Sequence, residues 1–139
     1  MPAFRTSSEA ETIAFGERLA LDLPSKRVVL LIGNLGAGKT TLAKGIVKGR
    51  GAAQPEDVSS PTFTLIHEYG SGVYHIDLYR LDEAREVETL GLDELFERDA
   101  LVLIEWGERF PQLMPAGRTE IRLRRTGDET REIEVTALP

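Results

Sequence analysis

The sequence predicts an α/β fold in which a mostly parallel sheet is flanked by helices. Two short apolar runs, 28–32 and 101–104, are typical of strands that such a sheet buries on both faces. A glycine-rich segment, 33–38, separates the first run from residues 41–48, whose apolar side chains recur at helical spacing. A strand, a glycine-rich turn and a helix in this order indicate a loop that can bind phosphate groups.

The first predicted helix covers residues 8 to about 20. Ser8 is a suitable N-cap and Glu11 follows three residues later, which is the spacing of a capping box. A turn around Pro24 then leads into the buried strand 28–32. The side chains of this helix expected to face the core are Ala10, Ile13, Ala14 and Leu19.

An antiparallel hairpin is predicted after the second helix, 41–48. A polar connection with two prolines covers 51–61, and residues 62–69 and 73–79 then have the β-branched and aromatic content of strands. Gly70-Ser71-Gly72 supplies the turn. The hairpin distinguishes this chain from a simple alternation of strands and helices. The core side of the second helix is expected to carry Leu42, Ala43, Ile46 and Val47.

The remaining elements end in a second hairpin, which closes the predicted fold. The alternating segments 119–124 and 131–135 flank a turn at Gly127-Asp128. Before them, the sequence predicts helices near 82–88 and 93–97, a parallel strand at 101–105, and a short helix or loop over 106–117.

The glycine-rich segment fits the pattern G-x-x-x-x-G-K-[ST] of P-loop nucleoside triphosphatases. Its glycines allow a tight turn that aims backbone N–H groups at phosphate oxygens. Lys39 can reach the β- and γ-phosphates, and the Thr40 hydroxyl can bind Mg²⁺. The fold is therefore expected to be P-loop NTPase-like. The predicted nucleotide-binding segment is Gly33, Asn34, Leu35, Gly36, Ala37, Gly38, Lys39, Thr40 and Thr41.

Three further residues are candidates for the chemistry at this loop. Glu105 ends a buried strand, where a carboxylate can bind the metal; the alternative is a polar residue at which the strand simply leaves the core. Asp77 ends the second hairpin strand and can position the attacking water or hold Mg²⁺ through water; the alternative is an acid that merely ends a strand. Thr62 follows the polar connection and is a switch candidate, although a threonine that starts a strand is equally ordinary.

Composition limits the classes of partner. The net charge of −6 argues against a free-standing nucleic-acid binder. The excess of acid lies in residues 82–99, which form either a solvated face or a docking surface for a basic partner. No apolar run is long enough to span a membrane, and no cysteine is present. We expect one cytoplasmic P-loop ATPase domain over 1–139.

Several segments together resemble the TsaE (YjeE) family, the P-loop ATPases of bacterial tRNA threonylcarbamoyladenosine (t6A) synthesis. The resemblance covers almost the whole chain. The matching stretches are, in chain order, Gly33 to Thr41, Ser60-Pro61-Thr62-Phe63-Thr64, His75-Ile76-Asp77-Leu78-Tyr79-Arg80, Gly91-Leu92-Asp93-Glu94 and Leu103-Ile104-Glu105-Trp106. The first of these, the P-loop, is shared by many families, whereas the second and third are specific to this one.

The resemblance implies a weak, Mg²⁺-dependent ATPase that works as a switch on a TsaB–TsaD pair, which modifies adenosine 37 of tRNA. ATP or ADP and Mg²⁺ would be the cofactors, tRNA would be touched only indirectly, and Thr40 and Glu105 would bind the metal. Lys39, Thr62, Asp77 and Glu105 would be catalytic. Trp106 would lie near the nucleotide, unless it only closes the edge of the core. Ser8, Glu9 and Arg131 would lie near the adenine.

Two alternatives use the same loop. A small-molecule kinase needs an acceptor site and an arginine-bearing lid, and neither is recognisable in this sequence. A nucleotide-binding adaptor would bind ATP without hydrolysing it. No arginine is clearly placed to assist hydrolysis from within the chain; Arg80 is the nearest candidate by sequence and Arg109 the next.

Overall fold

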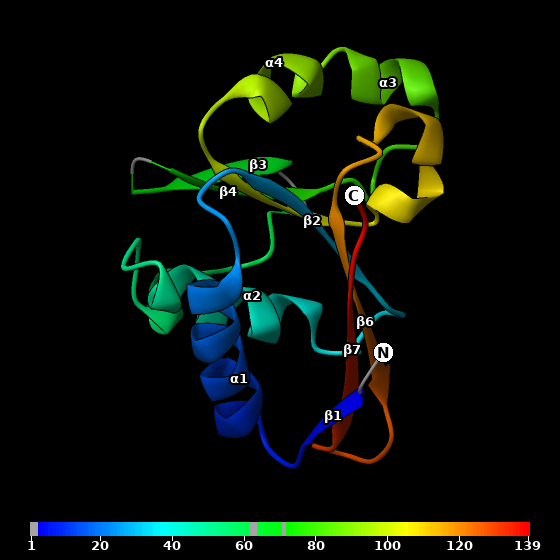
Figure 1. The fold of residues 1–139 in the computed structure, drawn as a ribbon. Coiled ribbons are helices and arrows are strands. Elements are labelled where there is room, and N and C mark those ends of the chain that lie inside the picture. Colours follow the sequence, from blue (N-terminus) through cyan, green and yellow to red (C-terminus); the bar gives the residue numbers. More distant parts are fainter. Residues whose placement is uncertain (1–2, 62–63, 71) are drawn as a thin grey trace.

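The computed structural model describes residues 3–61, 64–70 and 72–139, and these form a mixed seven-stranded sheet flanked by helices (Figure 1). The strand order is β1-β7-β6-β2-β5-β4-β3, and β6, β2, β5 and β4 run parallel. In chain order the elements are β1 (Ala3–Thr6), α1 (Glu9–Asp22), β2 (Arg27–Ile32), α2 (Lys39–Gly49), η1 (Pro55–Asp57), β3 (Ile66–Tyr69), β4 (Val73–Asp77), α3 (Ala84–Glu88), α4 (Leu92–Glu97), β5 (Leu101–Glu105), η2 (Gly107–Arg109), η3 (Pro111–Leu113), β6 (Thr119–Arg125) and β7 (Arg131–Ala137).

The sheet separates two apolar cores. Alternate residues of β2 point to opposite faces, so Val29 and Leu31 pack with α1 and α2 while Val28 and Leu30 pack with α3 and α4. Both predicted parallel strands are confirmed, and they are neighbours whose registry places Leu31 opposite Glu105. Such strands read as continuous apolar runs because both faces of the sheet are covered.

Both predicted hairpins are confirmed as antiparallel pairs, β3 with β4 and β6 with β7. The described strands differ from the expected ranges, because β3 begins at Ile66, β4 ends at Asp77 and β7 continues to Ala137. Thr62 lies outside the described residues.

The short strand β1, Ala3–Thr6, was not predicted from the sequence. It pairs antiparallel with β7 at the edge of the sheet, and Phe4 lies opposite Ile133. Four residues carry too little periodicity to indicate a strand, and only the exposed edge of β7 completes its hydrogen bonding.

The prediction for the buried face of α1 was wrong for Ala10, which is exposed, while Ile13, Ala14 and Leu19 are half-buried. The buried residues of this helix are Thr12, Phe15, Gly16 and Ala20. The reason is a close contact with α2, since a Cβ at Gly16 would lie 2.7 Å from the Leu42 carbonyl oxygen. The buried face of α1 is therefore determined by Gly16, which lets the two helices approach closely. A search for large apolar side chains does not detect such a residue.

The N-terminus of α1 is capped as expected, with a shift of one residue. The Ser8 Oγ accepts a hydrogen bond from the Glu11 N–H at 3.1 Å, but the Glu11 carboxylate accepts from the Ser7 N–H at 2.9 Å instead of that of Ser8. The core side predicted for α2 is confirmed, because Leu42, Ala43, Ile46 and Val47 are all fully buried.

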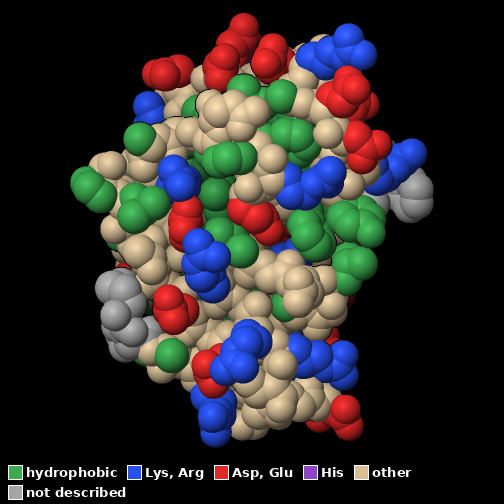
Figure 2. Space-filling model, turned by 90° about the vertical axis from the view of Figure 1, so that its right-hand side faces the viewer, with side chains coloured by type: hydrophobic (Ala, Val, Ile, Leu, Met, Phe, Trp, Pro, Cys, Tyr) green, Lys and Arg blue, Asp and Glu red, His purple; other side chains and the backbone are tan. Residues whose placement is uncertain are grey.

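The acidic segment forms the α3–α4 end of the molecule, and its acidic side chains are exposed there (Figure 2). Both predicted short helices are present, and Glu86 completes a capping box with Glu83. Backbone hydrogen bonds from Glu83 and Asp82 lower the pKa of Glu86. Among the described helices, none has the length and apolar character needed to cross a membrane.

Candidate functional site

The first wall of the site is the loop between β2 and α2. Gly38 has φ of 103°, in the left-handed region that favours glycine, and α2 begins at the next residue, Lys39. The loop is closed by a hydrogen bond from the Ala37 N–H to the Asn34 carbonyl at 3.0 Å. The turn therefore brings the first N–H groups of α2, which have no partner within the helix, to the carboxyl edge of the sheet.

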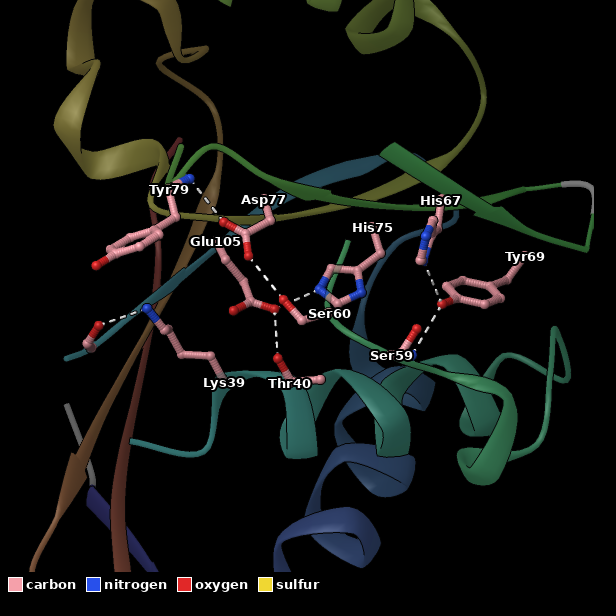
Figure 3. A network of polar contacts seen from close by, with 11 residues as sticks. Lys39, Thr40, Ser59, Ser60, His67, Tyr69, His75, Asp77, Tyr79 and Glu105 are labelled. Atoms are coloured by element: carbon pink, nitrogen blue, oxygen red, sulfur yellow. Dashed lines mark hydrogen bonds and ion pairs between the residues drawn. The ribbon is translucent and has the colours of Figure 1, made fainter. Parts of the chain in front are cut away.

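The opposite wall comes from the ends of two neighbouring strands (Figure 3). Asp77 of β4 and Glu105 of β5 are partners in the parallel registry, and both side chains are almost fully buried. Asp77 Oδ2 accepts a hydrogen bond from the Ser60 hydroxyl at 2.9 Å, and Oδ1 accepts one from the Tyr79 N–H at 2.9 Å. Asp77 thus joins the connection after α2 to the segment after β4.

A single carboxylate oxygen of Glu105 connects the two walls. Its Oε2 accepts a hydrogen bond from the Thr40 hydroxyl at 3.1 Å and lies 2.6 Å from His75 Nε2 (Figure 3). Because a carboxylate oxygen only accepts hydrogen bonds, Nε2 carries the hydrogen. His75 is fully buried and stands two residues before Asp77 on the same face of β4, so it fixes Glu105 from behind.

Lys39 is buried between the two walls. Its Nζ donates to the Gly33 carbonyl at 2.7 Å and lies 3.5 Å from the centre of the Trp106 ring. Burial lowers the pKa of Lys39, and the carboxylates of Glu105, Glu108 and Asp77 oppose this shift. The ammonium group is therefore partly removed from water but close to negative charge. This environment suits a cation that binds an anionic ligand.

Trp106 directly follows Glu105 and adopts φ of 68°, which is unusual for a residue other than glycine. This conformation ends β5 and turns the indole over Lys39. The Tyr79 ring packs against it with the ring centres 5.1 Å apart. The two aromatic side chains therefore cover one side of the cleft, and the contact of Trp106 with a nucleotide stays a prediction.

The two walls enclose an open cleft of about 440 Å³. Arg125 and Arg131, from the β6–β7 hairpin, complete its rim. A smaller hollow of about 160 Å³ adjoins it, and Gly38, Thr41 and Arg131 line both. The smaller hollow is also lined by Glu9 and Thr12 of α1.

The structure brings most, but not all, of the predicted site residues to this cleft. Leu35, Gly36, Gly38, Lys39, Thr40, Thr41, Asp77, Glu105 and Trp106 line it. Gly33 and Asn34 instead border a separate hollow beside β6 and β7, and Ala37 is buried. Ser8 uses its hydroxyl in the cap of α1, whereas Glu9 and Arg131 meet at the smaller hollow.

Within the described part of the chain, the residues of the larger cleft and its support that were missed are Ser60, His75, Tyr79 and Arg125. The signal for His75 was available, because it stands two positions before Asp77 in a strand and shares its face. Arg125 carried no such signal, since only the pairing of β6 with β2 brings the closing hairpin to the loop. Arg109, a candidate to assist hydrolysis, instead donates to the Tyr79 carbonyl at 2.9 Å.

The site combines a glycine-rich loop at the carboxyl edge of the parallel strands, a buried lysine and a strand-end carboxylate that faces the loop. These features define a P-loop-type nucleotide-binding protein. The sequence profile described as "Threonylcarbamoyl adenosine biosynthesis protein TsaE" matches residues 6–133. The chain belongs to the TsaE family, as the sequence stretches predicted.

Relatives and a solved structure agree with this assignment. The chain is 42% identical over 138 residues to the tRNA threonylcarbamoyladenosine biosynthesis protein TsaE of Bacillus subtilis, covering 97% of this chain and 85% of that protein. It is 37% identical to the protein of the same name from Haemophilus influenzae, covering 93% and 85%. The crystal structure of Bacillus subtilis YdiB superposes with a TM-score of 0.79 at 35% identity, covering 99% of this chain and 86% of that one.

Proposed function

We propose that this chain is a weak, partner-activated, Mg²⁺-dependent ATPase of tRNA threonylcarbamoyladenosine synthesis. The observation that carries the proposal is the pair of oxygens formed by the Thr40 hydroxyl and the Glu105 carboxylate, 3.1 Å apart beside the buried Lys39. In P-loop proteins a lysine and a threonine of the loop and a strand-end carboxylate are the groups that hold the phosphates and the metal.

The spacing of these two oxygens suits one small divalent cation. Adjacent ligands of an octahedral Mg²⁺ at about 2.1 Å lie about 3 Å from each other. Within the described residues, no group of three or more histidine, cysteine, aspartate and glutamate side chains forms a metal site. A bound Mg²⁺ would neutralise charge on the phosphates, which would share its coordination with water, Thr40 and Glu105.

The remaining residues of the cleft would orient the nucleotide and a water molecule. Lys39 would leave the Gly33 carbonyl for the phosphate chain, since its ammonium group is already desolvated. Asp77, which Ser60 and the Tyr79 N–H hold in place, would position the attacking water. Thr62 remains a proposed switch residue, because Ser60 of the same connection already contacts Asp77.

The smaller hollow is the proposed place of the adenine. Glu9 and Arg131 line it together with Gly38, whereas Trp106 lines the larger cleft. Ser8 would act there only through the cap that fixes the first turn of α1. ATP would therefore extend from this hollow along the loop toward Glu105.

The names of the relatives place them in tRNA threonylcarbamoyladenosine synthesis. We extend this role to the present chain, as one cytoplasmic domain that resets a TsaB–TsaD complex and touches tRNA only indirectly. The activating partner is proposed from the resemblance to the TsaE family. Arg109 is not held toward the cleft, because its guanidinium donates hydrogen bonds to the Leu78 and Tyr79 carbonyls.

The test is steady-state ATP hydrolysis by the purified protein, alone and with TsaB and TsaD. Activity should rise on adding the pair and fall at least about 100-fold in Glu105→Ala, the usual scale for losing a preorganised charged group. Glu134→Ala, an exposed acid on β7, is the matched control. Fast ATP hydrolysis whose rate does not change when TsaB and TsaD are added would contradict the proposal. ADP formation that requires a small alcohol as acceptor would also contradict it and would indicate a kinase. Binding without hydrolysis in either condition would indicate an adaptor.

A further inference from the structure

The β6–β7 hairpin presents two arginines to the phosphate-binding loop. Arg125 and Arg131 are partners in the antiparallel registry, so their side chains share one face of the sheet. Leu123, two residues before Arg125, packs on α1 and α2 on that same face. Arg124 points to the other face, where its guanidinium pairs with Glu132 at 2.9 Å.

Backbone carbonyls hold both arginines beside the loop. Arg125 Nε donates to the Gly127 carbonyl at 2.9 Å, and Arg131 Nη1 donates to the Thr130 carbonyl at 3.0 Å. A Cβ at Gly36 would lie 3.9 Å from Arg125 Nη1, and one at Gly38 would lie 3.1 Å from Arg131 Nε. The guanidinium groups therefore flank the loop at two successive points.

Both arginines retain donors for a ligand. Arg131 Nε is buried and has no hydrogen-bond partner among the residues that the structure describes. A guanidinium carries five N–H donors, and the Arg125 contacts use only part of this set. Its ion pair with Asp128 is long, at 3.8 Å, and both side chains are well exposed, so it contributes little.

The two arginines occupy different positions along the cleft. Arg131 lines both the larger cleft and the smaller hollow, so it stands at their junction. Arg125 lines only the larger cleft, together with Lys39 and Glu105. If the base occupies the smaller hollow, Arg125 lies at the phosphate end and Arg131 lies nearer to the middle of the nucleotide.

We propose that Arg125 contacts the terminal phosphate of the nucleotide and makes the protein distinguish a nucleoside triphosphate from a diphosphate. The inference rests on the proposed function, since it requires nucleotide in this cleft. A planar guanidinium suits phosphate oxygens, and a diphosphate lacks the group that Arg125 would contact.

The experiment is a binding titration followed by the fluorescence of Trp106, the single tryptophan, which lines the cleft. ADP and a non-hydrolysable ATP analogue are titrated with Mg²⁺ into the wild type, Arg125→Gln, Arg125→Lys and Arg124→Gln. Arg124→Gln removes the same charge from the same strand on the other face, and thermal unfolding checks that each variant is folded.

Arg125→Gln should weaken the analogue about tenfold, the scale of one charge-assisted hydrogen bond, and ADP less than about twofold. Arg125→Lys should fall between the wild type and Arg125→Gln, and Arg124→Gln should match the wild type. Equal weakening of both nucleotides, or a lower unfolding temperature with unchanged preference, would show that Arg125 only braces the hairpin turn. A wild-type protein that binds neither nucleotide would overturn the proposed function as well; one that binds both, with Arg125→Gln unchanged, overturns this inference alone.

Discussion

The two walls of the cleft are built in different ways. The loop wall, from Leu35 to Thr41, is one continuous stretch at the start of α2, and its expected ligand contacts are largely made by backbone. The opposite wall gathers side chains from β4 and β5, among them Asp77 and Glu105, and the β6–β7 hairpin adds Arg125 at the rim. The first wall depends on local conformation, whereas the second depends on the registry of strands that are distant in sequence.

This difference predicts how each wall fails. A substitution behind the loop should lower the stability of the fold and leave the site intact in the molecules that stay folded. A substitution behind the carboxylates should leave nucleotide binding in place and impair the chemistry. The following predictions test that contrast, from the largest expected effect to the smallest.

Removal of His75 should have the largest effect, because its Nε2 holds Glu105 from within the core. We expect His75→Ala to lower the rate of ATP hydrolysis at least about tenfold, as for the loss of one orienting hydrogen bond, with affinity for ADP within about threefold. The buried cavity should also lower the free energy of unfolding by about 2–4 kcal/mol. Single-turnover hydrolysis, ADP titration and urea unfolding measure these quantities.

His67→Ala is the matched control, since His67 is the registry partner of His75 on β3 but is only half-buried. It should change neither hydrolysis nor affinity. His75→Gln keeps an N–H donor and fills most of the space, so it should recover part of the rate. Full activity in folded His75→Ala would show that Glu105 needs no support from behind.

A substitution at the close contact between α1 and α2 tests the loop wall, because α2 directly follows the loop. A Cβ at Gly16 would lie 2.7 Å from the Leu42 carbonyl oxygen and 2.9 Å from the Ile46 nitrogen. Gly16→Val should lower the free energy of unfolding by about 1–3 kcal/mol through overpacking, measured by urea unfolding. ADP affinity at a temperature where the variant is folded should stay unchanged.

The exposed Ala10 of the same helix supplies the control, because Ala10→Val also introduces a valine but at a position exposed to solvent. It should cost only the small helix propensity difference of about 0.5 kcal/mol. A large loss of ADP affinity in folded Gly16→Val would mean that the loop conformation depends on how α1 packs. The loop wall would then not depend on local conformation alone.

Glu108 should give the smallest effect. It lies two residues after Trp106, and its Oε1 is buried without a partner within the described part of the chain. Burial raises the pKa of its carboxyl, opposed first by a hydrogen bond from its own backbone N–H and then by the charges of Lys39, Arg122 and Arg109. A carboxyl whose pKa is raised on folding binds more protons in the native state, so its contribution to stability is complete below the ordinary value of 4.5 and is lost as pH rises through the folded pKa.

Glu108→Gln should therefore stabilise the fold slightly at neutral pH, by less than about 0.5 kcal/mol because the side chain is only half-buried. The gain should shrink as the pH falls toward 4.5, the ordinary value. Urea unfolding at several pH values measures it, with the exposed Glu94→Gln as control. A variant less stable than the wild type at neutral pH would mean that ionised Glu108 stabilises Lys39 more than burial disfavours it.

The sequence predicted those parts of the molecule that local patterns encode. The strand, loop and helix around Lys39, the buried strand that ends at Glu105 and both hairpins are present, although the bounds of the hairpin strands differ from those expected. The apolar run before Glu105 indicated a strand buried on both faces, and the adjacency of β2 and β5 then brought Glu105 to Thr40. By contrast, Ala10 was assigned to the core by periodicity alone, because the glycine contact that orients α1 has no apolar signal.

By itself the sequence determined the phosphate-binding loop, the strand-end carboxylates and membership of the TsaE family, since each is carried by one or more short stretches of neighbouring residues. Only the tertiary structure decided that His75 supports Glu105, that Ser60 holds Asp77, and that the closing hairpin brings Arg125 and Arg131 to the loop. These contacts join segments through strand order and registry. Hydrophobic burial across the whole sheet selects that order, and no local pattern encodes it.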